Sequence, residues 1–154
     1  PAKFDVARHE LELALLSLPR EARFGVILFR ERTIPVQELS VPASPKHIRR
    51  VLGMIDEMRP EGATDVYGPL STILHGSAPE DAEAANLVDF DTILFLSDGL
   101  PTAGSVTDPA EIRRRIRAFN VFARVRIQTI GIGAQNKAFL EGLASDSGGR
   151  YVAR

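Results

Sequence analysis

DTILFLSDG, residues 91–99, is a continuous apolar run of strand length that ends on a carboxylate followed by glycine. A run of this kind is typical of a strand buried on both faces of a parallel sheet. In open parallel α/β sheets, ligands bind in the crevice outside the carboxyl ends of the strands. Asp98, at the carboxyl end of the run, is therefore the first candidate for a functional side chain.

Predicted helices and strands alternate on both sides of this run. Apolar spacing, turn residues and Ser-Pro and Asp-Pro cap pairs predict, in order, a helix at 4–18, strands at 24–29 and 33–36, helices at 44–58 and from about 64, the strand at 91–97, a helix at 108–122, a strand at 126–132, a helix at 137–147 and a strand at 150–153. Residues 81–86 either extend the third helix or form another turn. This order predicts a doubly wound α/β fold, a mostly parallel sheet with helices on both faces.

The first predicted helix has no strand before it, although a parallel sheet needs crossover helices between strands. We therefore expect the parent polypeptide to supply a first, central strand upstream of Pro1. Without this strand, buried backbone groups would stay unpaired at a cost of roughly 1 to 3 kcal/mol each, and the fragment should not fold well alone. Residues 1–154 are thus expected to form a single, N-terminally incomplete domain.

Composition limits the classes of function. The chain has 154 residues, 44% of them hydrophobic, and a net charge of -1 from 19 basic and 20 acidic side chains, so no global charge attracts it to nucleic acid or an anionic membrane. No segment approaches the roughly 20 apolar residues needed to span a bilayer. The absence of cysteine excludes disulfides and thiol chemistry and fits a cytosolic or an exported bacterial domain equally well, so localisation stays open. Together with the high arginine content, it leans towards a bacterial protein.

Residue patterns that suggest catalysis or nucleic-acid binding have simpler interpretations. The arginines at 113–115 and 117 either form a basic patch or occupy a solvated helix face, and apolar residues at 112, 116 and 119 favour the second interpretation. GIG at 131–133 lacks the third glycine and the βαβ context of a dinucleotide-binding loop. The three histidines show no ligand spacing, and neither Ser71 nor Ser97 has an evident histidine partner. We expect no enzymatic activity.

Four motifs together resemble the von Willebrand factor type A domain family. They are FGVILF at 24–29, GATDVY at 62–67, LSDGLPT at 96–102 and TIGIG at 129–133, and they occur in the order seen in that family. FLEGLA at 139–144 and GGRY at 148–151 also look like its closing helix and strand. Each motif is weak alone, but four in the correct order, with matching elements between them, are strong. The resemblance covers nearly the whole chain and implies the Rossmann-like fold of the family.

The resemblance also implies a metal site. The family's metal-ion-dependent adhesion site uses an Asp-x-Ser-x-Ser loop after the first strand, a threonine at the start of a later helix and an aspartate after the fourth strand. Thr64 matches the threonine and Asp98 the aspartate, whereas the Asp-x-Ser-x-Ser loop is absent and would belong just before Pro1. A complete site is therefore expected only if that upstream loop is present. Hydroxyl and carboxylate oxygens suit Mg²⁺, or Mn²⁺ or Ca²⁺ in its place.

By resemblance, Thr64 would bind the ion directly or through water, and Asp98 mostly through water, leaving a coordination position for a partner's Glu or Asp. Structural alternatives remain open: Thr64 as a helix N-cap, and Asp98 as part of a turn. Asp65 would either tune the metal shell or only stabilise the first helical turn.

Two classes of function follow from the resemblance. The first is a protein-binding, adhesion-type domain that recognises an acidic side chain of a protein partner through a divalent metal. The alternative is a metal-free scaffold or assembly module, or an adaptor domain of a larger ATPase or chelatase complex. The partner and the oligomeric state stay open.

Overall fold

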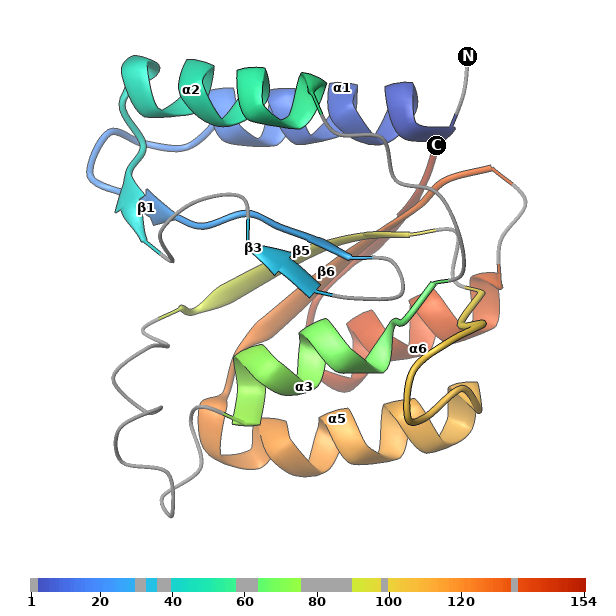
Figure 1. Ribbon diagram of the computed structural model, residues 1–154. Coiled ribbons are helices and arrows are strands. Elements are labelled where there is room, and N and C mark those ends of the chain that lie inside the picture. The colour runs from blue at the N-terminus through green and yellow to red at the C-terminus, as the bar shows by residue number, and fades with distance from the viewer. Residues whose placement is uncertain are drawn as a thin grey trace.

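A computed structural model describes residues 3–29, 33–35, 40–57, 64–75, 90–97, 100–133 and 136–154. Its elements form three layers, with strands between two groups of helices (Figure 1). One face of the strands is covered by α1 (Lys3–Leu16) and α2 (Pro45–Asp56). The other face is covered by α3 (Tyr67–His75), α5 (Pro109–Ala123) and α6 (Lys137–Asp146). The predicted α/β fold with helices on both faces is confirmed.

The parallel sheet has the order β5-β6-β7. Its strands are β5 (Thr92–Ser97), β6 (Arg126–Gly131) and β7 (Tyr151–Ala153). Parallel neighbours need a crossover, which α5 provides between β5 and β6, and α6 between β6 and β7. All three strands therefore run in one direction, and their carboxyl ends lie at the same edge of the sheet.

The predicted burial of the run at 91–97 on both faces is only partly correct. Phe95 and Ser97 are buried, whereas Leu94 and Leu96 are half-buried. Successive residues of a strand point to opposite faces, so the face of β5 that carries Phe95 and Ser97 is covered more completely than the other. The covered face belongs to the core formed with α3, α5 and α6.

The strand predicted at 24–29 is divided in the structure. β1 (Arg23–Phe24) pairs antiparallel with β4 (Val41–Pro42), and β2 (Ile27–Phe29) pairs antiparallel with β3 (Thr33–Pro35). The chain thus changes its hydrogen-bonding partner between Phe24 and Ile27, which is why one apolar run forms two short strands. The predicted strand at 33–36 is present as β3. Within the described ranges these pairs and β5-β6-β7 form three separate sheets.

Proline pairs mark two helix starts as predicted. The hydroxyl of Ser44 accepts a hydrogen bond from the N–H of His47, and Pro45 occupies the first turn of α2. Asp108 precedes Pro109 at the start of α5 without a side-chain cap bond. Residues 81–86, for which the sequence left a helical extension or a turn open, lie outside the described residues.

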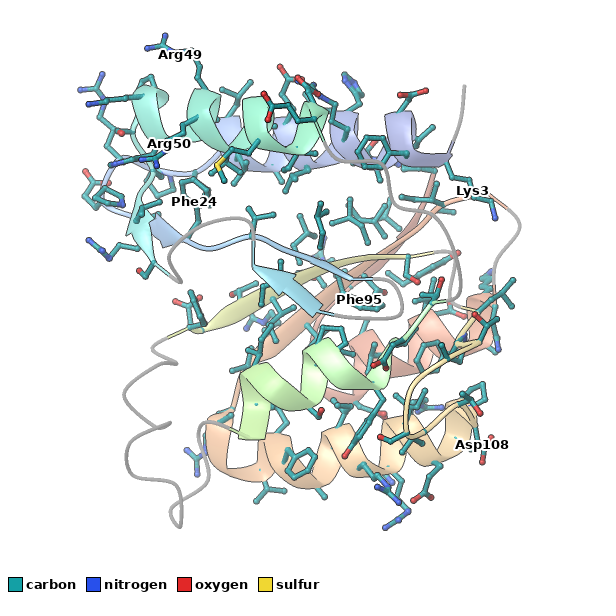
Figure 2. The ribbon with its side chains drawn as sticks, viewed as in Figure 1. Lys3, Phe24, Arg49, Arg50, Phe95 and Asp108 are labelled. Carbon is teal, nitrogen blue, oxygen red and sulfur yellow. The ribbon has the colours of Figure 1, made fainter. Side chains whose placement is uncertain are left out.

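Two hydrophobic cores lie on the two faces of the sheet region. Phe24 belongs to the core under α1 and α2, and Phe95 to the core over α3, α5 and α6 (Figure 2). Four apolar residues of α2, spaced three and four positions apart, are buried: Ile48, Val51, Leu52 and Ile55. Every helix in the described part of the chain falls short of the length or hydrophobicity required of a bilayer-spanning helix.

Candidate functional site

Thr64 lies half-buried on the segment that leads into α3. Its backbone N–H donates to Oγ1 of Thr102 at 2.8 Å. Its carbonyl oxygen accepts hydrogen bonds from the N–H groups of Thr102, at 2.9 Å, and Ala103, at 3.0 Å. Three hydrogen bonds therefore join the segment carrying Thr64 to the loop between β5 and α5.

This loop begins at the carboxyl end of β5, the edge where the sequence predicts a ligand site. β5 ends at Ser97, and Thr102 follows five residues later. Asp98 and Gly99 lie outside the described residues. The structure thus brings Thr64 to the loop that contains Asp98 in the sequence, and the role of Asp98 as a ligand stays a prediction.

Asp65 caps α3. Its Oδ1 accepts a hydrogen bond of 2.8 Å from the N–H of Gly68 in the first turn of the helix. This hydrogen bond supports the interpretation of Asp65 as a residue that stabilises the first helical turn, through a direct contact in place of the macrodipole effect expected from sequence. The side chain that caps the helix is therefore that of Asp65, one residue after Thr64.

The donor atoms near Thr64 fit only part of a metal site. Hydroxyl oxygen suits a hard divalent ion, and Thr64 supplies one. Across the described ranges, no group of three or more histidine, aspartate or glutamate side chains is arranged to hold a metal ion. Asp98, which lies outside those ranges, is the first candidate for a further donor.

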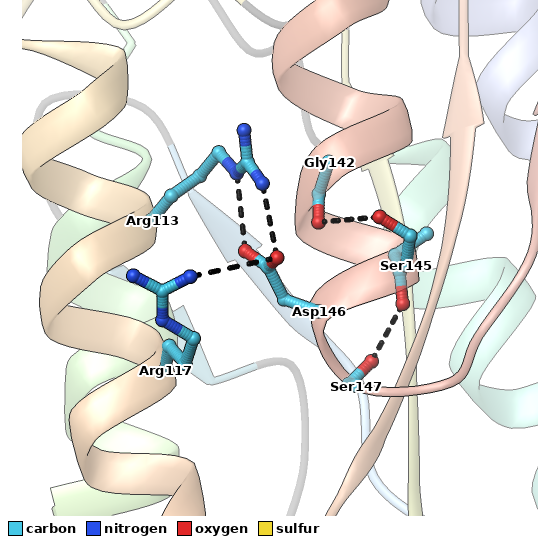
Figure 3. Close-up of polar contacts among 7 residues, drawn as sticks. Arg113, Arg117, Gly142, Ser145, Asp146 and Ser147 are labelled. Carbon is cyan, nitrogen blue, oxygen red and sulfur yellow. Dashed lines mark hydrogen bonds and ion pairs between the residues drawn. The ribbon is translucent and has the colours of Figure 1, made fainter.

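A cavity of about 160 Å³ lies between α5 and α6, at the amino end of β6. Arg113 spans it and donates two hydrogen bonds to Asp146, at 2.9 and 3.1 Å, and Arg117 lies 4.0 Å from the same carboxylate (Figure 3). A Cβ at Gly142 would overlap with the guanidinium of Arg113, so glycine lets the arginine lie across α6. The pair joins two helices at the sheet edge opposite to Thr64.

The other arginines of α5 are also paired. Arg114 and Arg115 both donate to Glu111, and these hydrogen bonds lower the pKa of Glu111 to about 2. The guanidinium of Arg115 also lies 5.7 Å from the ring centre of Tyr67. These contacts support the interpretation of a solvated helix face, because the guanidinium groups of Arg114 and Arg115 interact with side chains of α5 and α3.

Thr102 and Gly104 also lie at the candidate site, although no pattern in the sequence indicates that either residue is functional. Thr102 lies within the motif at 96–102, yet its hydrogen bond to Thr64 crosses 38 residues and leaves no local pattern. Gly104 has a positive φ of 95°, which glycine adopts readily. In the local sequence, a glycine two residues after the Pro-Thr pair at 101–102 indicates a loop but no functional role.

A family model described as von Willebrand factor type A domain matches residues 2–153. No curated protein matches the chain. The fold resembles solved structures at low sequence identity. A von Willebrand factor type A protein from Catenulispora acidiphila is similar with a TM-score of 0.76 and 16% identity, over 98% of this chain and 34% of that one.

Two further similar structures contain metal. Manganese-loaded TRAP protein from Plasmodium vivax has a TM-score of 0.66 and 20% identity, over 90% of this chain and 54% of that one. Proximal thread matrix protein 1 from the mussel byssus, with a zinc-occupied MIDAS motif, has a TM-score of 0.67 and 17% identity, over 98% and 39%. This chain spans about a third to a half of these three structures, and the likeness concerns the fold.

Proposed function

The chain belongs to the von Willebrand factor type A family, and from this premise we propose that it is a protein-binding domain. The proposed site recognises an acidic side chain of a partner protein through a divalent metal ion. Thr64 and Asp98 contribute to holding the ion, together with donors from the rest of the polypeptide. The proposed role is binding, without a chemical reaction.

The observation that carries this proposal is the attachment of Thr64 to the loop after β5. The bonds between Thr64 and Thr102 hold a hydroxyl-bearing residue and the segment that follows the predicted ligand strand at one edge of the sheet. Thr64 makes these bonds through its backbone N–H and carbonyl oxygen, so they hold both segments in place without using its hydroxyl. The arrangement is what a site shared between two loops requires.

Two similar structures support a metal at such a site. The TRAP protein is manganese-loaded, and the byssus protein has a zinc-occupied MIDAS motif. Magnesium remains our choice for this chain, because a hydroxyl and a carboxylate are hard oxygen donors, with manganese or calcium as alternatives. Those two structures hold different metals, which supports testing more than one ion on this chain.

The chemistry proposed for the residues is simple. A divalent ion would supply positive charge and an open coordination position for the partner's Glu or Asp carboxylate. Thr64 would contribute a neutral oxygen, which leaves more of the positive charge for the incoming group than a second carboxylate would. Asp98 would contribute one negative charge, directly or through water.

Calorimetric titration with Mg²⁺ and with Mn²⁺, on the full-length protein, tests the proposal. We expect saturable binding that Asp98→Ala abolishes and Thr64→Ala weakens by about tenfold or more, because loss of a residue that merely supports a metal ligand already costs about 10- to 100-fold in affinity. Peptides with a single glutamate should then bind only with metal present, and their glutamine versions should not bind.

Matched controls lie in the same loop. Thr107 and Asp108 are both exposed, and Asp108 makes no side-chain cap bond. Thr107→Ala and Asp108→Ala should therefore leave metal affinity unchanged. A folded protein that binds neither ion would refute the proposal and favour the metal-free scaffold.

A further inference from the structure

The carboxylate of Asp65 lies in a slot between two glycines from different segments. A Cβ added to Gly104 would lie 2.5 Å from Cγ of Asp65, and one added to Gly68 would lie 2.9 Å from the same atom. Both distances are shorter than real Cβ contacts. Glycine is therefore needed on both sides for the carboxylate to fit.

Gly68 belongs to the first turn of α3, whereas Gly104 belongs to the loop between β5 and α5. Oδ1 of Asp65 accepts the N–H of Gly68 at 2.8 Å, which fixes the carboxylate to the helix. The backbone of Asp65 forms a parallel bridge with Ala103, which fixes the residue to the loop. One side chain thus packs against both segments.

The same contacts argue against a ligand role for Asp65. Oδ1 is engaged by an N–H of the helix, and both oxygens pack against glycine positions. A carboxylate held in this way has little freedom to turn towards an ion. The carboxylate of Asp65 acts through its size, which sets the spacing between the start of α3 and the loop between β5 and α5.

We propose that Asp65 is a positioning residue: its carboxylate, packed between Gly68 and Gly104, sets the position of Thr64 relative to the loop after β5. The link to metal binding rests on the proposed function, since Thr64 is a proposed ligand there. The positioning itself does not depend on a metal. Asp65 touches neither the ion nor the partner.

Amide hydrogen exchange in the full-length protein, without divalent metal, measures the positioning directly. The N–H groups of Thr102 and Ala103 donate to Thr64, so they report whether the loop stays in place. In Asp65→Ala we expect these two amides to exchange about tenfold faster or more, as in local opening, with unchanged exchange in β6. Asp65→Asn keeps the oxygen and the shape, and should restore slow exchange.

Three outcomes would overturn the inference. Unchanged exchange at Thr102 and Ala103 in Asp65→Ala would show that the carboxylate does not hold the loop. Equal acceleration throughout the chain, β6 included, would show only a loss of global stability. Equal acceleration in Asp65→Asn and Asp65→Ala would show that shape and packing are not the cause.

Glycine substitutions give a second, independent test. Gly104→Ala pushes a methyl group against Asp65 and should also accelerate exchange at Thr102 and Ala103. Gly148→Ala is the matched control, because Gly148 has a similar positive φ of 77° but nothing within 4 Å of an added Cβ. The control should leave these two amides unchanged, and an equal effect of both variants would contradict the slot.

Metal titration of the same variants separates this inference from the proposed function. If the wild type binds neither Mg²⁺ nor Mn²⁺ but Asp65→Ala still accelerates loop exchange, the proposed function fails and the positioning role stands. If the wild type binds metal and Asp65→Ala alters neither exchange nor affinity, the positioning role fails. If both hold, Asp65→Ala should weaken metal binding by about fivefold or more and Asp65→Asn should restore it, as for residues that support a ligand.

Discussion

The backbone N–H of Thr64 donates a 2.8 Å hydrogen bond to the hydroxyl of Thr102, 38 residues further along the chain. In return, the carbonyl of Thr64 accepts the N–H of Thr102 at 2.9 Å. The two threonines thus form a reciprocal pair between the start of α3 and the loop after β5. The pair determines which segments meet at the candidate site, and a change to either threonine should therefore affect the site.

Thr102→Val removes the hydroxyl acceptor and keeps the branched shape. The N–H of Thr64 then loses its partner, which should lower the free energy of unfolding by about 1 kcal/mol. Divalent metal affinity should fall as well, because the loop holds Thr64 less firmly. Urea denaturation and calorimetry measure the two effects. Thr107→Val, at an exposed position of the same loop, should change neither, and an equal response of both variants would contradict the prediction.

Asp146→Asn should loosen the contact between α5 and α6. Asp146 accepts two hydrogen bonds from Arg113, which raise the pKa of that arginine, and its own side chain is only 16% exposed. Because Arg113 is 36% exposed, solvent screens the pair, and we expect a loss of about 1 kcal/mol in urea denaturation. Glu141→Gln makes the same charge change at an exposed position of α6. A loss as large in that control would attribute the effect to net charge.

Glu111 should make stability depend on pH in the acid range. Hydrogen bonds from Arg114 and Arg115 lower its pKa from 4.5 to about 2, so the unfolded chain takes up the proton first as the pH falls. Its contribution to stability is fully present above pH 4.5 and is lost as the pH falls towards 2. The difference in urea midpoint between the wild type and Glu111→Gln should therefore narrow over this window. It should also shrink in about 1 M salt, where exposed charges are screened; a constant difference would refute the prediction.

Gly149→Ala should strongly destabilise the junction between α6 and β7. A Cβ at this position would lie 2.6 Å from the carbonyl carbon of Ile127 in β6, and a backbone atom cannot turn aside as a side chain can. We expect a loss of about 1 to 3 kcal/mol, measured by thermal or urea denaturation. Gly53→Ala, in α2 with nothing within 4 Å, should instead stabilise the protein by about 0.5 to 1 kcal/mol. The prediction is wrong if both substitutions act in the same direction.

The helices and the parallel strands could be predicted from the sequence because their signals are local. Apolar residues at 48, 51, 52 and 55 lie three and four positions apart, and all four are buried in α2. Ser44 and Asp108, each followed by proline, precede α2 and α5. Such patterns report which face of an element is buried and where it begins, because both depend on residues within a few positions.

Pairing between distant segments could not be predicted in the same way. The apolar run at 24–29 was expected to be one strand, but its two halves pair with β4 and with β3. The slot that holds Asp65 depends on Gly68 and Gly104, which the sequence places 36 positions apart. Every residue except proline has a backbone N–H, and every glycine lacks a side chain. The local sequence therefore does not indicate which partner such a group meets in the fold.

Taken alone, the sequence determined the order of the described helices and of the parallel strands, the burial pattern of α2, the family and the choice of Thr64 and Asp98 as candidate ligands. Those results depend on periodicity and on short motifs, which the chain carries in its side chains. The tertiary structure alone decided that the loop after β5 bonds to Thr64 through Thr102, and that Asp65 caps α3 between two glycines. Both arrangements depend on backbone hydrogen-bonding groups and on the absence of a side chain at two glycines. These groups meet their partners only when the fold brings the loops together at one edge of the sheet.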